Sequence, residues 1–280
     1  MTAITQKGAT GPLSLFNQAF SANPYNTPQT TAGTGGFDAN LGNLVGSKWD
    51  TNTGGTVALV QNGAVAIASG KLVQAPTQLT AFQKLAMTVP TAYPATVGAT
   101  QILVTNGGTV LKQNLFAGGT LVVASGTGIG QTLQIGSHQQ AAASATFVVT
   151  LVDPIVVTLD ATSTVSMIAN PYNGVLISNH STLGTPVGVS LYPLAASTAP
   201  TFDGTSGILT AAGVAQFGFV VTSGPVGCLI DAVTNVGYPL GPSTNTDGAL
   251  NVATLTSSPQ VAISGQTQTS TQAGLVYMQL

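Results

Sequence analysis

Residues 114–159 carry the clearest structural signal in the sequence. Four short runs rich in Val, Ile, Thr and Leu follow one another here, separated by glycine clusters and by an Asp153-Pro154 turn. β-Branched side chains favour the extended backbone, whereas Gly, Asp and Pro favour turns, so this spacing is typical of successive strands in an antiparallel sheet. No amphipathic helix fits the segment. We therefore predict an all-β chain.

A glycine-rich loop inside this stretch invites comparison with nucleotide-binding motifs. Gly126, Gly128 and Gly130 match the first half of the dinucleotide fingerprint, but the third glycine comes one residue early. Another strand-like run follows where a helix should begin, and no Lys-Ser or Lys-Thr pair completes a phosphate loop. We interpret the segment as a hairpin loop that uses glycine for positive φ angles.

Charged residues are scarce in this chain. Only 4% of its 280 residues are charged, against about 25% in ordinary proteins. The five cations are all lysines and the seven acids all aspartates, which leaves a net charge of −2. Nucleic-acid binding needs clustered cations and bidentate recognition of acidic groups needs arginine, so neither function is expected. A surface this nearly neutral favours a protein that contacts copies of itself or a scaffold.

Residues that support catalysis or metal binding are few. Cys228 lies in an apolar run and is expected to be a buried small hydrophobe. His138 and His180 lack partners at metal-binding spacing and are expected on the surface or in loops. Several aspartates belong to turn sequences where the side chain has a local role. We predict no catalytic residues, no cofactor, no metal site and no enzyme activity.

The beginning of the chain lacks a basic segment followed by an apolar one, and no run of about 18 apolar residues occurs. The sequence therefore predicts neither export nor membrane insertion, and it favours synthesis in a cytoplasm.

Three regions follow from the distribution of strand-like runs. Residues 1–45 are rich in Thr, Asn, Gln, Pro and Gly and are predicted to form an extended N-terminal arm. Residues 46–180 and 181–280 are predicted to form two small bodies, each a β-barrel or β-sandwich. We expect the arm to lie on the body, on a neighbouring subunit or on a partner; a disordered linker is the alternative. Its candidate partner-binding residues are spaced aromatics: Phe16, Phe20, Tyr25 and Phe37.

Two hairpins are predicted from Asn-Gly pairs. Asn62-Gly63 is expected to join strands over residues 56–60 and 64–68, and a second turn to join 101–105 with 109–111. Trp49 is interpreted as a core anchor rather than a residue that stacks on a ligand. Residues 80–87 are assigned to a strand, with a short helix as the alternative.

Several of these segments resemble virion structural proteins of tailed bacteriophages. The similarity lies in residues 63–76, 115–135 and 151–159, and residues 186–190 with 217–226 and 247–250 look like capsid decoration, or cement, proteins. The resemblance implies a protein that binds the outside of an icosahedral shell of major capsid proteins, often as a homotrimer, and stabilises the shell. It also implies a location on the virion exterior after synthesis in the host cytoplasm.

A phage tail component or a receptor-binding adhesin is the alternative function. It would require a projecting, glycan-binding tip, and only a few aromatics (Tyr192, Phe202 and Tyr238) lie near predicted loops. A major capsid subunit is disfavoured because that fold needs a long helix that the sequence does not predict.

Overall fold

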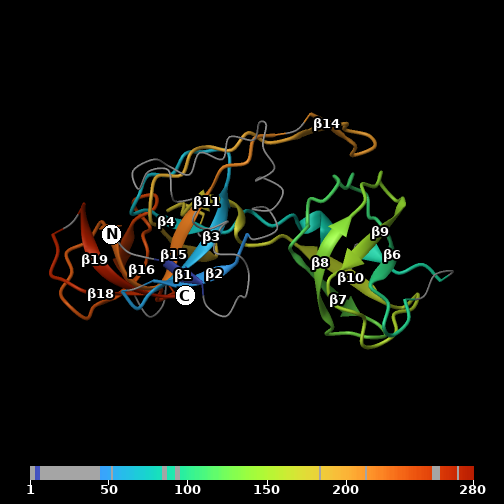
Figure 1. The fold of residues 1–280 in the computed structure, drawn as a ribbon, viewed down its shortest axis with the longest axis horizontal. Coiled ribbons are helices and arrows are strands. Elements are labelled where there is room, and N and C mark those ends of the chain that lie inside the picture. The colour runs from blue at the N-terminus through green and yellow to red at the C-terminus, as the bar shows by residue number, and fades with distance from the viewer. Residues whose placement is uncertain are drawn as a thin grey trace. The chain divides into compact units, whose positions relative to one another are not determined.

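The computed structural model describes residues 4–6, 45–51, 53–83, 87–91, 95–182, 184–211, 213–253, 259–269 and 271–280. Within these ranges the chain forms strands β1 to β19 and one short 3-10 helix, η1, with no α-helix (Figure 1). The predicted all-β class with barrel-like bodies is confirmed.

The chain divides into two compact units, and the second is inserted into the first. Unit 1 contains residues 1–76, 171–199 and 214–280, and unit 2 contains residues 77–170 and 200–213. This division differs from the predicted bodies 46–180 and 181–280. The physical reason is the ladder between β3 (Thr56–Asn62) and β15 (Phe217–Ile230), which joins segments that no local pattern connects.

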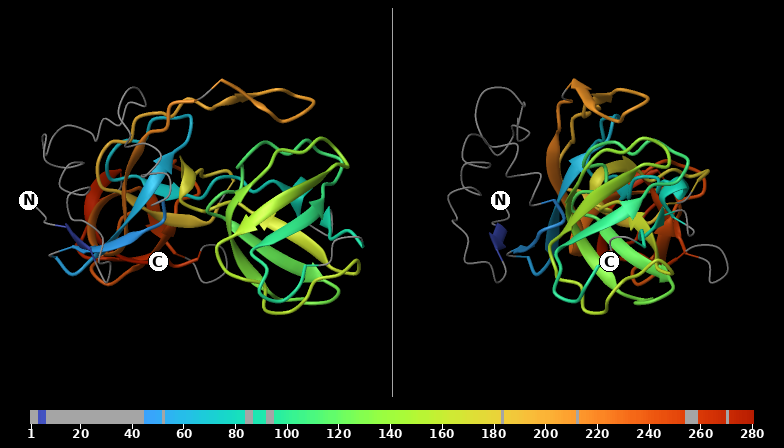
Figure 2. Two further views of the ribbon diagram at one scale, coloured as in Figure 1. Left: turned by 45° about the vertical axis from the view of Figure 1, so that its right-hand side comes forward. Right: turned by 90° about the vertical axis from the view of Figure 1, so that its right-hand side faces the viewer.

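Unit 2 is a closed six-stranded antiparallel barrel (Figure 2). Its order is β10-β5-β6-β9-β8-β7, and every neighbouring pair is antiparallel. Alternate residues of its strands, such as Ile102 and Val104, are buried and form one apolar core. The strands are β5 (Met87–Thr88), β6 (Gln101–Thr105), β7 (Thr120–Ser125), β8 (Thr132–His138), β9 (Thr146–Leu151) and β10 (Thr164–Ile168).

Unit 1 is built around β15, a strand of 14 residues. The first half of β15 pairs with β3 and its second half with β19, so the strand belongs to two closed rings. One ring is β3-β11-β4-β12-β15 and the other is β15-β17-β16-β18-β19. The further strands are β1 (Ile4–Gln6), β2 (Lys48–Thr51), β4 (Leu72–Gln74), β11 (Asn173–Ile177), β12 (Pro186–Ser190), β16 (Pro239–Pro242), β17 (Leu250–Val252), β18 (Ala262–Ser264) and β19 (Gln272–Gln279).

Trp49 anchors the larger apolar cluster of unit 1, as predicted. Its side chain is 4% exposed, and its ring meets Phe219 edge to face at a centroid distance of 5.7 Å. Such a pair stabilises the fold by about 0.5–1.5 kcal/mol beyond the contribution of the apolar area that the two rings bury. The strand predicted over residues 80–87 was wrong at its beginning, where η1 (Thr80–Phe82) forms and matches the alternative of a short helix. Met87 begins β5.

A short hairpin of β13 (Thr201–Phe202) and β14 (Leu209–Ala211) belongs to unit 2 although unit 1 flanks it in sequence. The ammonium group of Lys112 lies 5.2 Å from the ring centroid of Phe202. The backbone N–H of Gln113 also donates to Gly207 O at 3.4 Å. A cation–π contact and a backbone bond therefore hold the hairpin against the barrel.

Both hairpins predicted from Asn-Gly pairs were wrong. After β3 the chain continues as a loop in which the Asn62 side-chain amide donates to Val65 O at 2.8 Å and to Ala195 O at 2.7 Å. The Asn106 amide donates in the same way to Thr109 O at 2.7 Å and to Ala142 O at 3.0 Å. Each asparagine is buried and fastens a loop to a distant segment, so no adjacent strand folds back on the first.

One turn recurs in both units. A residue of an isolated bridge is followed three positions later by a residue with positive φ. The residue with positive φ is glycine in three of these turns. In the other three it is Asn, Ser or Thr, which adopts the same left-handed backbone under strain. The positive-φ residues are Gly70, Gly98, Gly237, Asn114, Ser144 and Thr271.

Exchanging residue types at this turn position should change stability in opposite directions. Thr271→Gly removes a strained φ of 66° and should raise the free energy of unfolding by about 0.5–1 kcal/mol. The added Cβ of Gly98→Ala meets no neighbouring atom, so only the φ of 87° is unfavourable for alanine. The free energy of unfolding should fall by about 1 kcal/mol. Urea denaturation of both variants measures the changes; a neutral Gly98→Ala variant would contradict the assignment.

Candidate functional site

The predicted partner-binding residues Phe16, Phe20, Tyr25 and Phe37 lie outside the described residues. Of the predicted arm before residue 45, the structure describes only Ile4–Gln6, which pairs as β1 with β2 of the same chain. The placement of the four aromatics on a partner therefore stays a prediction.

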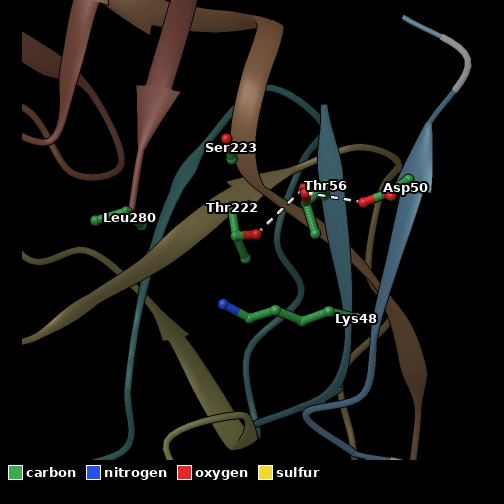
Figure 3. A pocket seen from close by; sticks show the side chains of 6 residues that line it. All are labelled: Lys48, Asp50, Thr56, Thr222, Ser223 and Leu280. Carbon is green, nitrogen blue, oxygen red and sulfur yellow. Dashed lines mark hydrogen bonds between the residues drawn. The ribbon is translucent and has the colours of Figure 1, made fainter. Parts of the chain in front are cut away.

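A pocket of about 260 Å³ opens beside β2 in unit 1 (Figure 3). Lys48 and Asp50 alternate with the buried Trp49 along β2, so both side chains lie on the face away from the core. The pocket is lined by Lys48, Asp50, Thr56, Thr222, Ser223 and Leu280.

Hydroxyl groups order one side of this pocket. Thr222 donates through its hydroxyl to Thr56 O at 3.2 Å, and the Thr56 hydroxyl donates to Asp50 Oδ1 at 3.4 Å. Figure 3 shows the Lys48 side chain extending across the pocket below Thr222. The lining offers one ammonium group, one carboxylate and hydroxyls, which suits polar recognition; these residues include no histidine or cysteine.

A different kind of surface lies on the loops at one end of the unit 2 barrel. Four large aliphatic side chains are 46–67% exposed there, and we call them the aliphatic loop surface: Val97, Ile129, Val156 and Val157. The two loops that carry the valines run antiparallel, because Ala95 bridges Leu159 and the Gly98 N–H donates to Ile155 O at 2.8 Å. Val97 is therefore close to Val157.

Gln131 fixes the backbone beneath this surface. Its side-chain carbonyl accepts from the N–H groups of Val156 at 3.0 Å and Val157 at 2.9 Å, and its amide donates to Val157 O at 2.8 Å. The valines are thus held outward by a hydrogen-bonded loop. Residues 95–98, 126–131 and 152–160 contain no cation and two carboxylates, Asp153 and Asp160.

The glycine-rich loop takes part in the same barrel end, and its interpretation as a hairpin loop is confirmed. It joins the antiparallel strands β7 and β8, and Gly126, Gly128 and Gly130 have φ angles of 75°, 79° and 88°. A Cβ at Gly126 would collide with the carbonyl group of Thr162. The chain itself fills the space beside Gly126.

Asp160 fastens the glycine loop to the turn that precedes β10. Thr127 donates to its carboxylate at 2.7 Å, and the Thr162 hydroxyl donates at 2.6 Å. Hydrogen bonds from Thr162 and then from Thr127 lower the pKa of the Asp160 carboxyl below its usual value. A carboxylate with these partners has a structural task in the turn.

His138 was predicted to be a surface or loop residue, and this was wrong. It ends β8 and is only 4% exposed, within the barrel core near Phe116 and Phe147. Its Nε2 accepts from the Phe116 N–H at 2.9 Å and its Nδ1 donates to Gln139 O at 2.9 Å, which defines a neutral ring. Burial lowers the pKa of His138 below 6.5. Strict alternation along β8 would have buried Ser137, but a register shift between Ile135 and Ser137 turns His138 inward instead.

His180 is exposed, as predicted, but it has a distant partner. Its Nδ1 lies 2.8 Å from Asp247 Oδ1, and its backbone N–H donates to the same oxygen at 2.8 Å. These bonds, the backbone one first, lower the pKa of the Asp247 carboxyl. Lys71 adds a bond to Asp247 O at 3.3 Å, so three polar residues tie three segments of unit 1 together.

Cys228 is buried, as predicted, and burial raises the pKa of its thiol to about 12. Among the described residues, no group of three or more His, Cys, Asp or Glu side chains converges as a metal site would require. The part of the chain that the structure describes also holds no helix long and apolar enough to cross a membrane.

Because burial lowers the pKa of His138, the free energy of unfolding of unit 2 should decrease on mild acidification. The unfolded chain takes up a proton near pH 6.5 while the folded state resists it, so stability is full above that pH and falls below it toward the lowered pKa. The urea midpoint should drop between pH 7.5 and 5.5, and His138→Gln should lose most of that drop. His180→Gln is the control and should keep it; an equal drop in all three proteins would contradict the assignment.

Comparison with known proteins identified no relative. Protein-family models, curated protein sequences and solved structures were compared with the chain, and none of them matches.

Proposed function

We propose that this chain is a non-catalytic structural protein that binds the outer surface of a phage capsid and stabilises the shell. The observation that carries the proposal is the aliphatic loop surface, where a hydrogen-bonded barrel end holds valine and isoleucine side chains in solvent. A protein gains nothing in its own fold from exposing these side chains. Such a surface supports burial against another protein.

The near absence of charge supports the same function. Only 4% of the residues are charged, so contacts with a partner depend on apolar burial and on backbone and hydroxyl hydrogen bonds. Such contacts are screened little by salt. A protein that bridges shell subunits acts by burying surface across their seams, and this chemistry suits it.

The partners and location come from the resemblance in the sequence. They are the major capsid protein of an icosahedral head and other copies of this chain, arranged as a homotrimer on the virion exterior. The weak net charge of −2 is compatible with close packing of copies, because repulsion between them is small.

Introducing charge on the aliphatic loop surface should weaken attachment to heads. The double variant Val97→Asp/Val156→Asp would bury two unpaired carboxylates in the contact, so co-sedimentation with heads should show at least about tenfold weaker binding. Val233→Asp/Val236→Asp is the matched control, since these valines are 68% and 66% exposed in unit 1. The control should bind within about twofold of the parent chain.

If the Val97→Asp/Val156→Asp variant binds heads as strongly as the parent chain, the aliphatic loop surface does not contact the shell. Co-sedimentation of the parent chain with isolated tails, and not with heads, would instead support the tail or receptor-binding function. Circular dichroism of each variant checks that its fold is retained.

Removal of residues 1–44 tests the predicted arm separately. The shortened chain lacks β1 and the four aromatics, and we expect its occupancy on heads to fall by at least about tenfold. Unchanged occupancy would refute a role for the arm in binding.

A further inference from the structure

Strand β1 occupies the end of the unit 1 sheet. Three pairs define its antiparallel register with β2, namely Ile4 with Thr51, Thr5 with Asp50 and Gln6 with Trp49. The opposite edge of β2 pairs with β3 through Lys48, Trp49 and Asp50. β1 therefore completes the hydrogen bonding of β2 on its outer side.

The connection between β1 and β2 is far longer than this pairing needs. Antiparallel neighbours can be joined by a turn of two residues, whereas residues 7–47 separate these two strands. At about 3.3 Å per residue, a segment of that length can span on the order of 100 Å. The covalent chain therefore does not require β1 to pair with the β2 of its own molecule.

The β2 edge is suited to receive a strand from elsewhere. An uncovered edge presents free N–H and C=O groups and is a template for pairing with another chain. The charged residues of β2, Lys48 and Asp50, are of opposite sign and lie two positions apart. A three-residue strand such as β1, Ile-Thr-Gln, can pair with the backbone groups of this edge and adds only a short strand to the sheet.

We propose that β1 of one copy pairs with β2 of a second copy, so that neighbouring molecules are linked by exchanged N-terminal strands. The ladder is the same within a chain and between chains, and proximity decides which of the two forms. The inference extends the proposed function, because copies bound side by side on a shell are at high local concentration. Its occupant is a second copy of this chain, in the register of β1.

Cysteine cross-linking distinguishes the two arrangements. Positions 5 and 50 are opposite each other in the ladder, so Thr5→Cys and Asp50→Cys place two thiols close together. The native Cys228 is buried and has a pKa of about 12, so it should not react. The two single variants are co-expressed with different tags, purified together through both tags in turn, and treated with a short bismaleimide.

Exchange predicts a covalent heterodimer of twice the 27.8 kDa chain mass, several-fold above the yield of a control pair. The control pair is Thr5→Cys with Gln101→Cys, whose position is exposed in unit 2 and has no place in the β1 ladder. The double variant Thr5→Cys/Asp50→Cys should likewise give covalent oligomers. Only internally closed monomers from the double variant, or failure of the paired tags to recover a complex, would overturn the proposal.

The cross-linking experiment tests strand exchange independently of the proposed capsid function. Cross-linked oligomers from a chain that does not bind heads would refute the capsid role and leave strand exchange standing. Full binding to heads by a chain that cross-links only within itself would refute strand exchange and leave the capsid role standing.

Discussion

Closure of its sheets is the constraint on which this structure depends. A chain with 4% charged residues has few ion pairs to set its geometry, so backbone ladders and apolar packing must do so. In unit 2 the six strands close completely, and in unit 1 β15 completes two rings at once. Closed sheets leave few edges for unwanted pairing. The sheet of unit 1 also extends beyond these rings, because β2 pairs with β3 and β1 pairs with β2.

The sequence predicted what is local and missed what is distant. Of the four strand-like runs in residues 114–159, three form β7, β8 and β9, whereas residues 155–159 form a loop with one bridge. The apolar surroundings of Cys228 predicted its burial. The Asn-Gly pair at Asn62 looked like a hairpin turn because the rule counts only neighbours in sequence. In the structure, the Asn62 amide bonds to Ala195 O, across 133 positions, and that bond decides the path of the loop.

The insertion of unit 2 was missed for the same reason. Turn and strand patterns look alike on both sides of residue 76, and the pairing of β11 with β3 and β4 shows that the first body resumes at residue 171. The aliphatic loop surface was also not predicted from the sequence, since Val97 and Val157 are brought together by the bridge between Ala95 and Leu159. The burial of His138 was missed as well, because a register shift between Ile135 and Ser137 breaks the alternation of β8 before it reaches this residue.

The aliphatic loop surface and strand β1 have different proposed partners. We propose that the aliphatic loop surface of unit 2 contacts the shell and that β1 links copies to one another. Electron microscopy of heads with and without this protein tests the central claim most directly. The account predicts added density on the outer capsid surface, joined between neighbouring copies; density confined to the tail, or no added density, would contradict it.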